Sequence, residues 1–307
     1  MLRFTLRQLE YLVAVGDCGS VTIAAERQRV SAPSISVAIA QLEAEMGLPL
    51  FIRRHAQGMV PTAQGQVLIA HARQVLDEAR QMVEAANRLS GMVKGNLTVG
   101  CLSTFAQIIL PRLRRRFSEE YPEVDFHQIE THQMALIEGL REARIDVALT
   151  YDLAVPTDLM FEGLAELPPF AFFAADHPLA GRASVTPAEL AEFPLILIDL
   201  PHSVDYFMSV FEGAGRKPFI FERSPDIAVV QSMVGNGFGY SIANFRPRTS
   251  EAPDGRRLAF VPLAGRVKPM RIGLLSAAGA RGLPTVSAFG DLCGRDLAGL
   301  LAGQSPA

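Results

Sequence analysis

The sequence predicts a multidomain α+β protein: a small helical part, then one long helix, then a larger α/β part. Up to about residue 90, apolar residues recur at the three- and four-residue spacings of helices. From about residue 95, short apolar runs alternate with helical stretches. At 307 residues, with 49% hydrophobic and 20% charged side chains, the chain is long enough for two or three domains with separate cores.

The charge balance argues against a generally polybasic nucleic-acid-binding protein. The formal net charge is −3, and residues 1–60 hold six arginines and five acidic residues. Any contact with DNA must therefore be local, and affinity should depend on more than one subunit.

The cysteines and the apolar runs indicate a cytoplasmic protein with no membrane partner. Cys18, Cys101 and Cys293 are few and far apart, which fits buried side chains in a reducing compartment. No apolar run is long enough to span a bilayer, and the N-terminus lacks a cleavable signal pattern.

Three short helices are expected before Gly47. Thr5 and Gln8 form a capping-box pattern for the first helix, whose predicted apolar face is Leu6, Leu9, Leu12 and Val13. Ser20 caps a second helix from Val21 to about Gln28, with Ala24 and Ala25 turned inward. Together with a third helix this is the spacing of a helix-turn-helix, although an ordinary helical hairpin has the same pattern.

The third helix is the candidate recognition helix. Ser31 caps it and Pro33 lies in its first turn. Its apolar stripe, Ile35, Ile39, Leu42 and Met46, is expected to face a core. The opposite face is short and uncharged, so the helix is slim enough for a groove about 12 Å wide. The residues of this helix expected to contact DNA are Ser31, Ala32, Pro33, Ser34, Ser36, Val37 and Gln41.

A short polar hairpin is expected in IRRHAQGMVPT (Ile52–Thr62), with a glycine at its tip. Arg53 and Arg54 are the densest positive charge near the recognition helix, and His55 is a weaker candidate. Arginines there can enter a minor groove or bind phosphates. A solvated turn is the alternative interpretation.

A single helix is expected from Thr62 to about Ser90. Its apolar residues keep an unbroken alternation of three- and four-residue spacings, which is a heptad seam. A helix of about 28 residues is roughly 42 Å long. A second copy would bury such a seam, so we expect a homodimer through residues 62–90; packing against the helix's own chain is the alternative. The seam consists of Leu68, Ala72, Val75, Ala79, Met82, Ala86 and Leu89.

From the hinge KGNL (Lys94–Leu97) onward the alternation predicts an α/β region with a largely parallel sheet. Strands are expected at 96–100, 124–130 and 145–150, with helices at 110–121 and 135–142. A second set of strands and helices follows between 161 and 244. A strand at 270–277 then returns the chain to the first lobe, before a helix from about Pro284 to Leu301.

Hydroxyl and imidazole side chains follow successive predicted strands. In open α/β sheets, ligands lie beyond the carboxyl ends of the strands, where helix starts direct free N–H groups toward anions. Each such residue alone is more often a plain helix cap. Together they indicate a site for a small organic acid or a similar polar metabolite. The candidates are Ser103, Thr104, Thr131, His132, Thr150, His202 and Ser203.

Several runs together resemble the LysR-type transcriptional regulators, in the family's order and over nearly the whole chain. They are LRQLEYLVAV (Leu6–Val15), GSVTIAAERQRVSAPSIS (Gly19–Ser36), IAQLEAEMGLPLF (Ile39–Phe51), VPTAQG (Val60–Gly65), ILPRLRRRFSEEYPEV (Ile109–Val124), IDVALTYD (Ile145–Asp152) and ADHPLAG (Ala175–Gly181).

The resemblance implies three domains. Residues 1–60 would form a winged helix-turn-helix whose wing is the polar hairpin, and 61–92 a linker helix that pairs two subunits. Residues 93–303 would form a two-lobed effector domain with a periplasmic-binding-protein-like fold. Lobe I would comprise about 93–165 and 269–303, and lobe II about 166–268.

The resemblance also implies partners. These are double-stranded DNA, a small-molecule effector and a second subunit, with a homotetramer and contact with RNA polymerase as further features of such regulators. Ser103, Thr131 and Ser203 are nearest to the family's usual effector contacts, and Asn244 and Phe245 would help to close the cleft between the lobes.

The recognition helix departs from the family pattern. Ala32 and Val37 stand where the family usually has Gln and an Arg or Lys, and no basic residue occurs from Ala32 to Met46. Bidentate contacts to guanine or adenine are therefore unavailable at those positions. Val37 and Ala32 would instead touch thymine methyl groups, with Ser34, Ser36 and Gln41 reaching bases or phosphates, and the wing would add shape readout.

The sequence contains no convincing catalytic or metal-binding motif. The six histidines lack metal-like spacing, no nucleophile elbow or P-loop occurs, and VGNGFG (Val234–Gly239) fits a tight turn better than a nucleotide-binding loop. We expect no enzymatic activity, no metal and no cofactor. Two functions stay open: a DNA-binding regulator, or a small-molecule-binding protein whose helical part serves oligomerisation.

Overall fold

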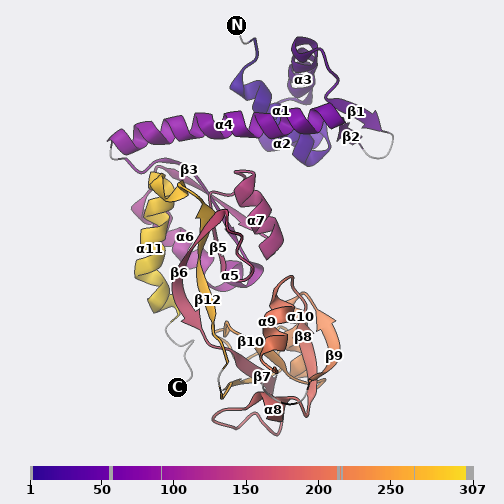
Figure 1. Ribbon diagram of the computed structural model, residues 1–307, viewed down its shortest axis with the longest axis vertical. Helices are drawn as coiled ribbons and strands as arrows, with labels where there is room; N and C mark the ends of the chain where they lie inside the picture. Colours follow the sequence, from indigo (N-terminus) through magenta and orange to yellow (C-terminus); the bar gives the residue numbers. More distant parts are fainter. Residues whose placement is uncertain are drawn as a thin grey trace. The chain divides into compact units, whose positions relative to one another are not determined.

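The computed structural model describes residues 3–54, 58–90, 92–212, 215, 217–265 and 267–301 of the chain. The chain divides into two compact units, Met1–Met92 and Val93–Ala307, here called the N-terminal unit and the C-terminal unit (Figure 1). No helix among the described residues combines the length and the apolar character needed to cross a membrane.

The N-terminal unit contains four helices and one hairpin among its described residues. The expected caps are confirmed: the Thr5 hydroxyl accepts from Gln8 N, the Ser20 hydroxyl from Ile23 N and the Ser31 hydroxyl from Ser34 N. The elements are α1 (Leu6–Cys18), α2 (Val21–Gln28), α3 (Ala32–Met46), β1 (Phe51–Arg54), β2 (Gly58–Pro61) and α4 (Ala63–Ser90).

The core of this unit corrects one predicted face. Leu6 is 48% exposed, whereas Tyr11 and Val15 of the same helix are buried. The buried face of α1 is centred on Leu12 and Val15, and at 100° per residue Leu6 lies beyond its edge. The predicted stripe of α3 does face the core, with Ile35, Ile39 and Leu42 buried and Met46 packed at its margin.

Helix α4 has two different halves. In the first half, Ile69, Ala72 and Leu76 are buried in the core of the N-terminal unit, together with residues of α1 and α3. The alternative prediction, that this helix packs against its own chain, is therefore confirmed for these turns. Ala72 is buried there and is not available to a second copy. Farther along, Met82 is 72% exposed and Val83 is also exposed. The side chain of Leu89 lies outside the described residues.

The first lobe of the C-terminal unit is built on a five-stranded sheet in the order β4-β3-β5-β12-β6. β3 is parallel to β4 and β5, and β12 is antiparallel to β5 and β6. Because β12 brings the chain back from the second lobe, it alone runs against the others, so the expected parallel sheet is interrupted by one strand. The strands are β3 (Gly95–Cys101), β4 (Val124–Glu130), β5 (Val147–Tyr151), β6 (Leu159–Leu167) and β12 (Met270–Ala277).

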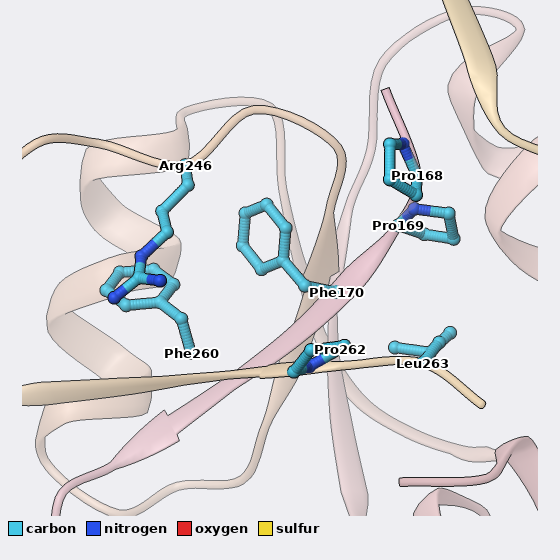
Figure 2. Close-up of a pocket in the computed structure, with 7 residues that line it drawn as sticks. All are labelled: Pro168, Pro169, Phe170, Arg246, Phe260, Pro262 and Leu263. Carbon is cyan, nitrogen blue, oxygen red and sulfur yellow. The ribbon is translucent and has the colours of Figure 1, made fainter. Parts of the chain in front are cut away.

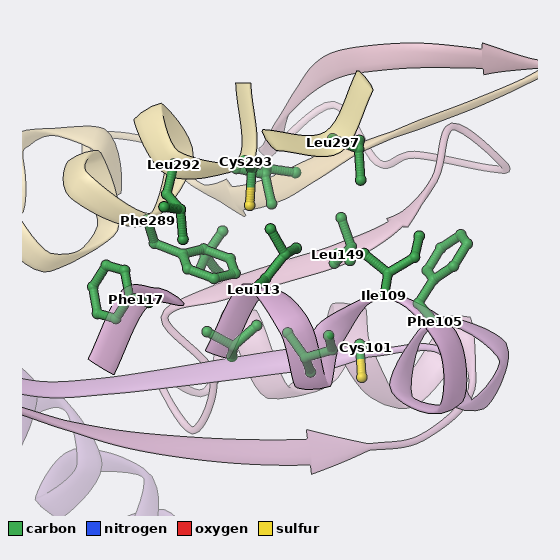
Figure 3. Packing of buried hydrophobic residues seen from close by; sticks show 14 of the residues in the cluster. Cys101, Phe105, Ile109, Leu113, Phe117, Leu149, Phe289, Leu292, Cys293 and Leu297 are labelled. Carbon is green, nitrogen blue, oxygen red and sulfur yellow. The ribbon is translucent and has the colours of Figure 1, made fainter. Parts of the chain in front are cut away.

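Helices cover both faces of this sheet. Val147 and Leu149 of β5 belong to a core with α5, α6 and α11, and Ala148, between them, belongs to a smaller core with α7 (Figures 1 and 3). This alternation follows from the two-residue period of a strand. The six-residue helix α5 was not predicted. The helices are α5 (Ser103–Ile108), α6 (Leu110–Glu120), α7 (Gln133–Arg141), α11 (Pro284–Leu300) and the short 3₁₀ turn η1 (Ala280–Gly282).

The second lobe has a separate core and two small sheets. β7 lies between β10 and β11, antiparallel to both, and β8 is parallel to β9. β11 was not predicted, since its pairing with β7 joins residues far apart in the chain. The elements are β7 (Phe170–Ala174), α8 (Pro187–Leu190), β8 (Pro194–Ile198), α9 (Ser203–Ser209), β9 (Phe219–Ser224), α10 (Ile227–Gly235), β10 (Ser241–Ala243) and β11 (Leu258–Pro262).

Candidate functional site

The outer face of α3 is exposed and carries no charged group along its centre. Ser36, Val37, Ala40 and Gln41 are exposed on the side opposite the buried stripe, and Val37 is 56% exposed. Pro33 is exposed in the first turn, and Ala32 beside it is half-buried. The arrangement presents a slim helix face, as a helix that enters a major groove requires.

Three residues predicted to contact DNA, Ser31, Ser34 and Gln41, have hydrogen-bond partners inside the unit. The Gln41 Oε1 atom accepts from Gln8 Nε2 at 2.9 Å, and Gln8 Oε1 in turn accepts from Thr5 N at 2.8 Å. At the start of α3, the Ser31 and Ser34 hydroxyls lie 2.7 Å apart. These contacts fix the helix start and join α1 to α3.

The hairpin after α3 has a fixed base. β1 and β2 pair antiparallel, from Phe51 opposite Pro61 to Arg54 opposite Gly58. Glu43 Oε1 on α3 accepts from Leu50 N at 2.7 Å, and Met59 N on β2 donates to Gly19 O at 2.8 Å. The backbone of Arg53 and Arg54 lies in β1, but their side chains, and all of His55, lie outside the described residues.

An apolar hollow of about 120 Å³ opens beside the first half of α4. Its lining combines core residues of α1 and α3 with residues of the predicted seam. Val75 of the seam is exposed at its edge. The lining residues are Phe4, Leu9, Leu12, Leu42, Met46, Leu50, Leu68, His71, Ala72 and Val75.

In the C-terminal unit, the register of the first lobe brings two predicted residues together. Cys101, the last residue of β3, pairs with Glu130 of β4, and Thr131 N donates to Cys101 O at 3.0 Å. Ser103, exposed at the first position of α5, and Thr131 therefore follow adjacent strand ends. Thr104 is half-buried in the same turn.

Two other predicted residues of this lobe serve the protein itself. The His132 Nδ1 atom caps α7 by accepting from Ala135 N at 3.4 Å. Thr150 is completely buried, and its hydroxyl donates to Gln133 Oε1. Gln133 Nε2 donates to Leu153 O at 3.0 Å. The Thr150 hydroxyl thus faces a buried amide and not a cleft.

The second lobe contributes His202 and Ser203 at the start of α9. His202 has a φ angle of 66°, a left-handed conformation that is uncommon outside glycine and clusters at functional sites. Its Nε2 atom lies 3.1 Å from the Met134 sulfur on α7, so this side chain touches the first lobe. Ser203 is half-buried next to it.

Asn244 is buried at the crossing between the lobes. Its Nδ2 group donates to Leu167 O at 2.8 Å and to the Tyr206 hydroxyl at 2.7 Å, and that hydroxyl donates to Lys268 O at 2.9 Å. Leu167 ends β6 and Lys268 precedes β12, so the pair holds both crossing strands. Burial raises the pKa of Tyr206 to about 12, which keeps its hydroxyl proton in place. The neighbouring Phe245 is buried 5.8 Å from the ring of Phe105.

A further cavity of about 80 Å³, not anticipated from the sequence, lies on the second lobe (Figure 2). The guanidinium of Arg246 lies over the Phe260 ring, 4.9 Å from its centroid. The sequence reasoning also missed Gln133, Met134 and Tyr206, whose contacts join segments distant in the chain. The cavity is lined by Pro168, Pro169, Phe170, Arg246, Phe260, Pro262 and Leu263.

Among the residues that the structure describes, the cysteines and acidic groups form no recognisable metal site. Within the described ranges, no group of three or more His, Cys, Asp or Glu side chains is arranged to hold an ion. Cys101 and Cys293 are buried in the core of the first lobe (Figure 3). Burial raises the pKa of Cys101 to about 12 and raises that of Cys293 as well.

Comparisons with known proteins agree with this architecture. Residues 6–66 match the bacterial regulatory helix-turn-helix of the lysR family, and residues 90–298 match the LysR substrate binding domain. The chain is 29% identical to the transcriptional activator protein LysR of Escherichia coli K12 over 245 residues, which is 80% of this chain and 78% of that protein.

Solved structures of regulators are similar over almost the whole length. HinK of Pseudomonas aeruginosa is 32% identical, with a TM-score of 0.65 over 96% of this chain and 99% of that one. CbnR, solved in complex with its target DNA, shares the fold at 22% identity, with a TM-score of 0.66 over 95% of this chain and 99% of that one.

A helix-turn-helix unit followed by a two-lobed substrate-binding domain defines a ligand-responsive regulator of transcription. The chain belongs to the LysR family of transcriptional regulators.

Proposed function

We propose that this chain binds a specific double-stranded DNA sequence through α3 and the β1–β2 hairpin, as a dimer, and that a small molecule between the two lobes controls this binding. The observation that carries the proposal is the exposed, slim face of α3 above a buried stripe, with the base of the hairpin joined to α3 through Glu43. CbnR, which has the same fold, binds its target DNA.

The second half of α4 is the proposed dimer contact. Met82 and Val83 are exposed on a helix whose first half is already packed, and the apolar hollow beside Val75 extends that surface. Burying apolar side chains of this kind favours association. The proposed boundaries are 1–60 for the DNA-binding domain, 61–92 for the linker helix and 93–303 for the effector domain. Pairs of dimers would form a tetramer.

The proposed effector is a small organic acid or a similar polar metabolite. Ser103 and Thr131 follow adjacent strand ends in the first lobe, and His202 and Ser203 lie opposite on the second. His202 contacts Met134 across the two lobes, so a molecule bound beside this contact would change the distance between the lobes. Thr150 and Asn244 act from behind this surface, since their side chains are hydrogen-bonded within the protein. The protein would act in the cytoplasm, without a cofactor and without catalysing a reaction.

Footprinting of the purified full-length protein on DNA flanking its own gene, at near-physiological salt, tests the DNA-binding proposal. We expect protection of an interrupted palindrome whose half-sites lie on one face of the DNA. If a genome-wide selection of bound fragments also recovers no common sequence, the DNA-binding proposal fails. The oligomerising small-molecule-binding protein is then the better description.

Calorimetric titration with a panel of organic acids tests the cleft. A metabolite that binds should lose most of its affinity in the Ser103→Ala, Thr131→Ala double variant. Ser118→Ala, an exposed serine on α6, is the matched control and should leave the affinity unchanged. Unchanged affinity in the double variant contradicts the site.

A further inference from the structure

Val37 is the largest apolar side chain exposed on the outer face of α3. It is 56% exposed, near the middle of the face that the proposed function directs into the major groove. Its neighbours on that face, Ser36, Ala40 and Ala32, are small. Apart from Gln41, Val37 is therefore the largest side chain exposed near the centre of this face, and it presents two methyl groups.

Hydrogen-bonding side chains on this face are poorly placed to select a base. A glutamine reads adenine by using its oxygen and its nitrogen together, but Gln41 Oε1 already accepts from Gln8 Nε2. The hydroxyl of Ser34 lies 2.7 Å from that of Ser31. Ser36 is exposed, yet a hydroxyl group pairs with donors and acceptors alike and discriminates little between bases.

Charge does not provide the selection either. No arginine or lysine occurs from Ala32 to Met46, so guanine cannot be read by the usual bidentate contact from this helix. The remaining base-specific feature of the major groove is apolar, namely the methyl group on C5 of a pyrimidine. DNA carries this group on thymine and on 5-methylcytosine.

We infer that Val37 reads the C5-methyl group of a pyrimidine in each half-site. The inference rests on the proposed function and assigns the base-selecting contact of that function to one side chain. The contact buries about one methyl group, which corresponds to a difference of about three- to ten-fold in affinity.

The test uses the full-length protein and a duplex recovered by selection from a randomised pool. Each thymine of the duplex is replaced in turn by deoxyuridine, which lacks only the methyl group. We expect one thymine per half-site at which wild-type protein loses about three- to ten-fold in affinity. Val37→Ala should lose the same factor on the original duplex and bind both duplexes equally.

A parallel series replaces each cytosine by 5-methylcytosine and identifies the source of the methyl group. A loss with deoxyuridine and no gain with 5-methylcytosine assigns thymine, whereas a Val37-dependent gain at one cytosine assigns the methylated base. Val67→Ala is the matched control, because Val67 is 57% exposed on α4. This variant should discriminate as the wild type does.

If the wild-type protein binds every deoxyuridine and 5-methylcytosine duplex as tightly as the original, the inference is wrong. The proposed function still holds in that case, provided that the protein binds its selected duplex. Discrimination that persists in Val37→Ala also overturns it. If no duplex is recovered, both proposals fail. Should Val37→Ala unfold at a lower temperature than wild type, Val37→Thr, which keeps the branched shape but only one methyl group, provides the second test and should discriminate less than wild type.

Discussion

In the N-terminal unit, the surface proposed to contact DNA lies on the outside of one core that α1, α3 and α4 share. In the C-terminal unit, the proposed effector residues lie at strand ends on two lobes, each with a separate core. At the crossing between those lobes, Asn244 and Tyr206 are hydrogen-bonded to each other, His202 contacts Met134 on the first lobe, and Phe245 packs against Phe105. Packing fixes the first surface, whereas hinge contacts set the geometry of the second.

The largest expected difference between the units is in thiol reactivity. Raising the pKa of Cys101 to about 12 lowers its thiolate fraction at pH 8 by about a thousand-fold relative to an ordinary cysteine. Cys101 and Cys293 should therefore react with a thiol reagent only when the C-terminal unit opens, while the half-buried Cys18 of the N-terminal unit reacts earlier. Reaction rates of wild type and Cys18→Ser measure this. A fast thiol in native Cys18→Ser protein would contradict it.

A cavity in the core of the N-terminal unit should lower the stability of that unit and leave the stability of the C-terminal unit unchanged. Leu42→Ala leaves a cavity where α3 meets α1 and α4, and should lower the free energy of unfolding by about 3 kcal/mol. DNA binding should weaken with it, while unfolding of the C-terminal unit is unchanged. Urea titration followed by circular dichroism tests this. The control Ile23→Ala, at a side chain 54% exposed on α2, should change stability by less than about 0.5 kcal/mol.

A smaller change at the hinge should affect the C-terminal unit. Tyr206→Phe removes the donor to Lys268 O and the acceptor for Asn244, and should lower the free energy of unfolding by about 1–2 kcal/mol. Effector affinity should change in the same variant, because the segment before β12 loses its hydrogen bond to Tyr206 and Asn244 keeps only Leu167 O as an acceptor. Tyr121→Phe is the matched control, since the Tyr121 hydroxyl donates to the exposed Glu120 and takes no part in the crossing between the lobes. Equal effects of the two variants would argue against a hinge role.

The smallest expected effect is at the surface of the first lobe. Arg141 forms two hydrogen bonds with Asp158, which lowers the pKa of that carboxyl group. The stabilisation is complete above the ordinary aspartate pKa of about 3.9 and is lost as pH falls through the lowered value. Because both groups are exposed, Asp158→Asn should leave the melting temperature at pH 7 nearly unchanged. Melting curves between pH 7 and pH 2 of the two proteins should converge at the acid end.

The elements that the sequence predicts well are those fixed by local chemistry. The caps at Thr5, Ser20 and Ser31 each involve a residue three positions away, and they place α1, α2 and α3. The apolar stripe of α3 likewise follows from helical period alone. Local sequence also predicts most strands of the first lobe, because each is a short apolar run between turns.

The features that the sequence does not predict depend on distant partners. Gln41 looks like a base-reading residue until Gln8, 33 positions earlier, is seen to bind it. Thr150 lies near the end of a strand, β5, but its partner Gln133 lies on α7, so the hydroxyl is internal. Leu6 fits the apolar spacing and still lies off the buried face, because the position of that face is set by α3 and α4.

The lack of arginine and lysine from Ala32 to Met46 affects how strongly DNA binding depends on the salt concentration in the cell. Each phosphate neutralised by a basic side chain makes affinity fall more steeply as salt rises. A recognition helix without such residues releases few counterions itself, so the salt dependence of target occupancy should come from basic residues outside α3, such as Arg53 and Arg54 of the hairpin. The same property weakens attachment to unrelated DNA, which leaves a larger share of the molecules free to search the chromosome through solution.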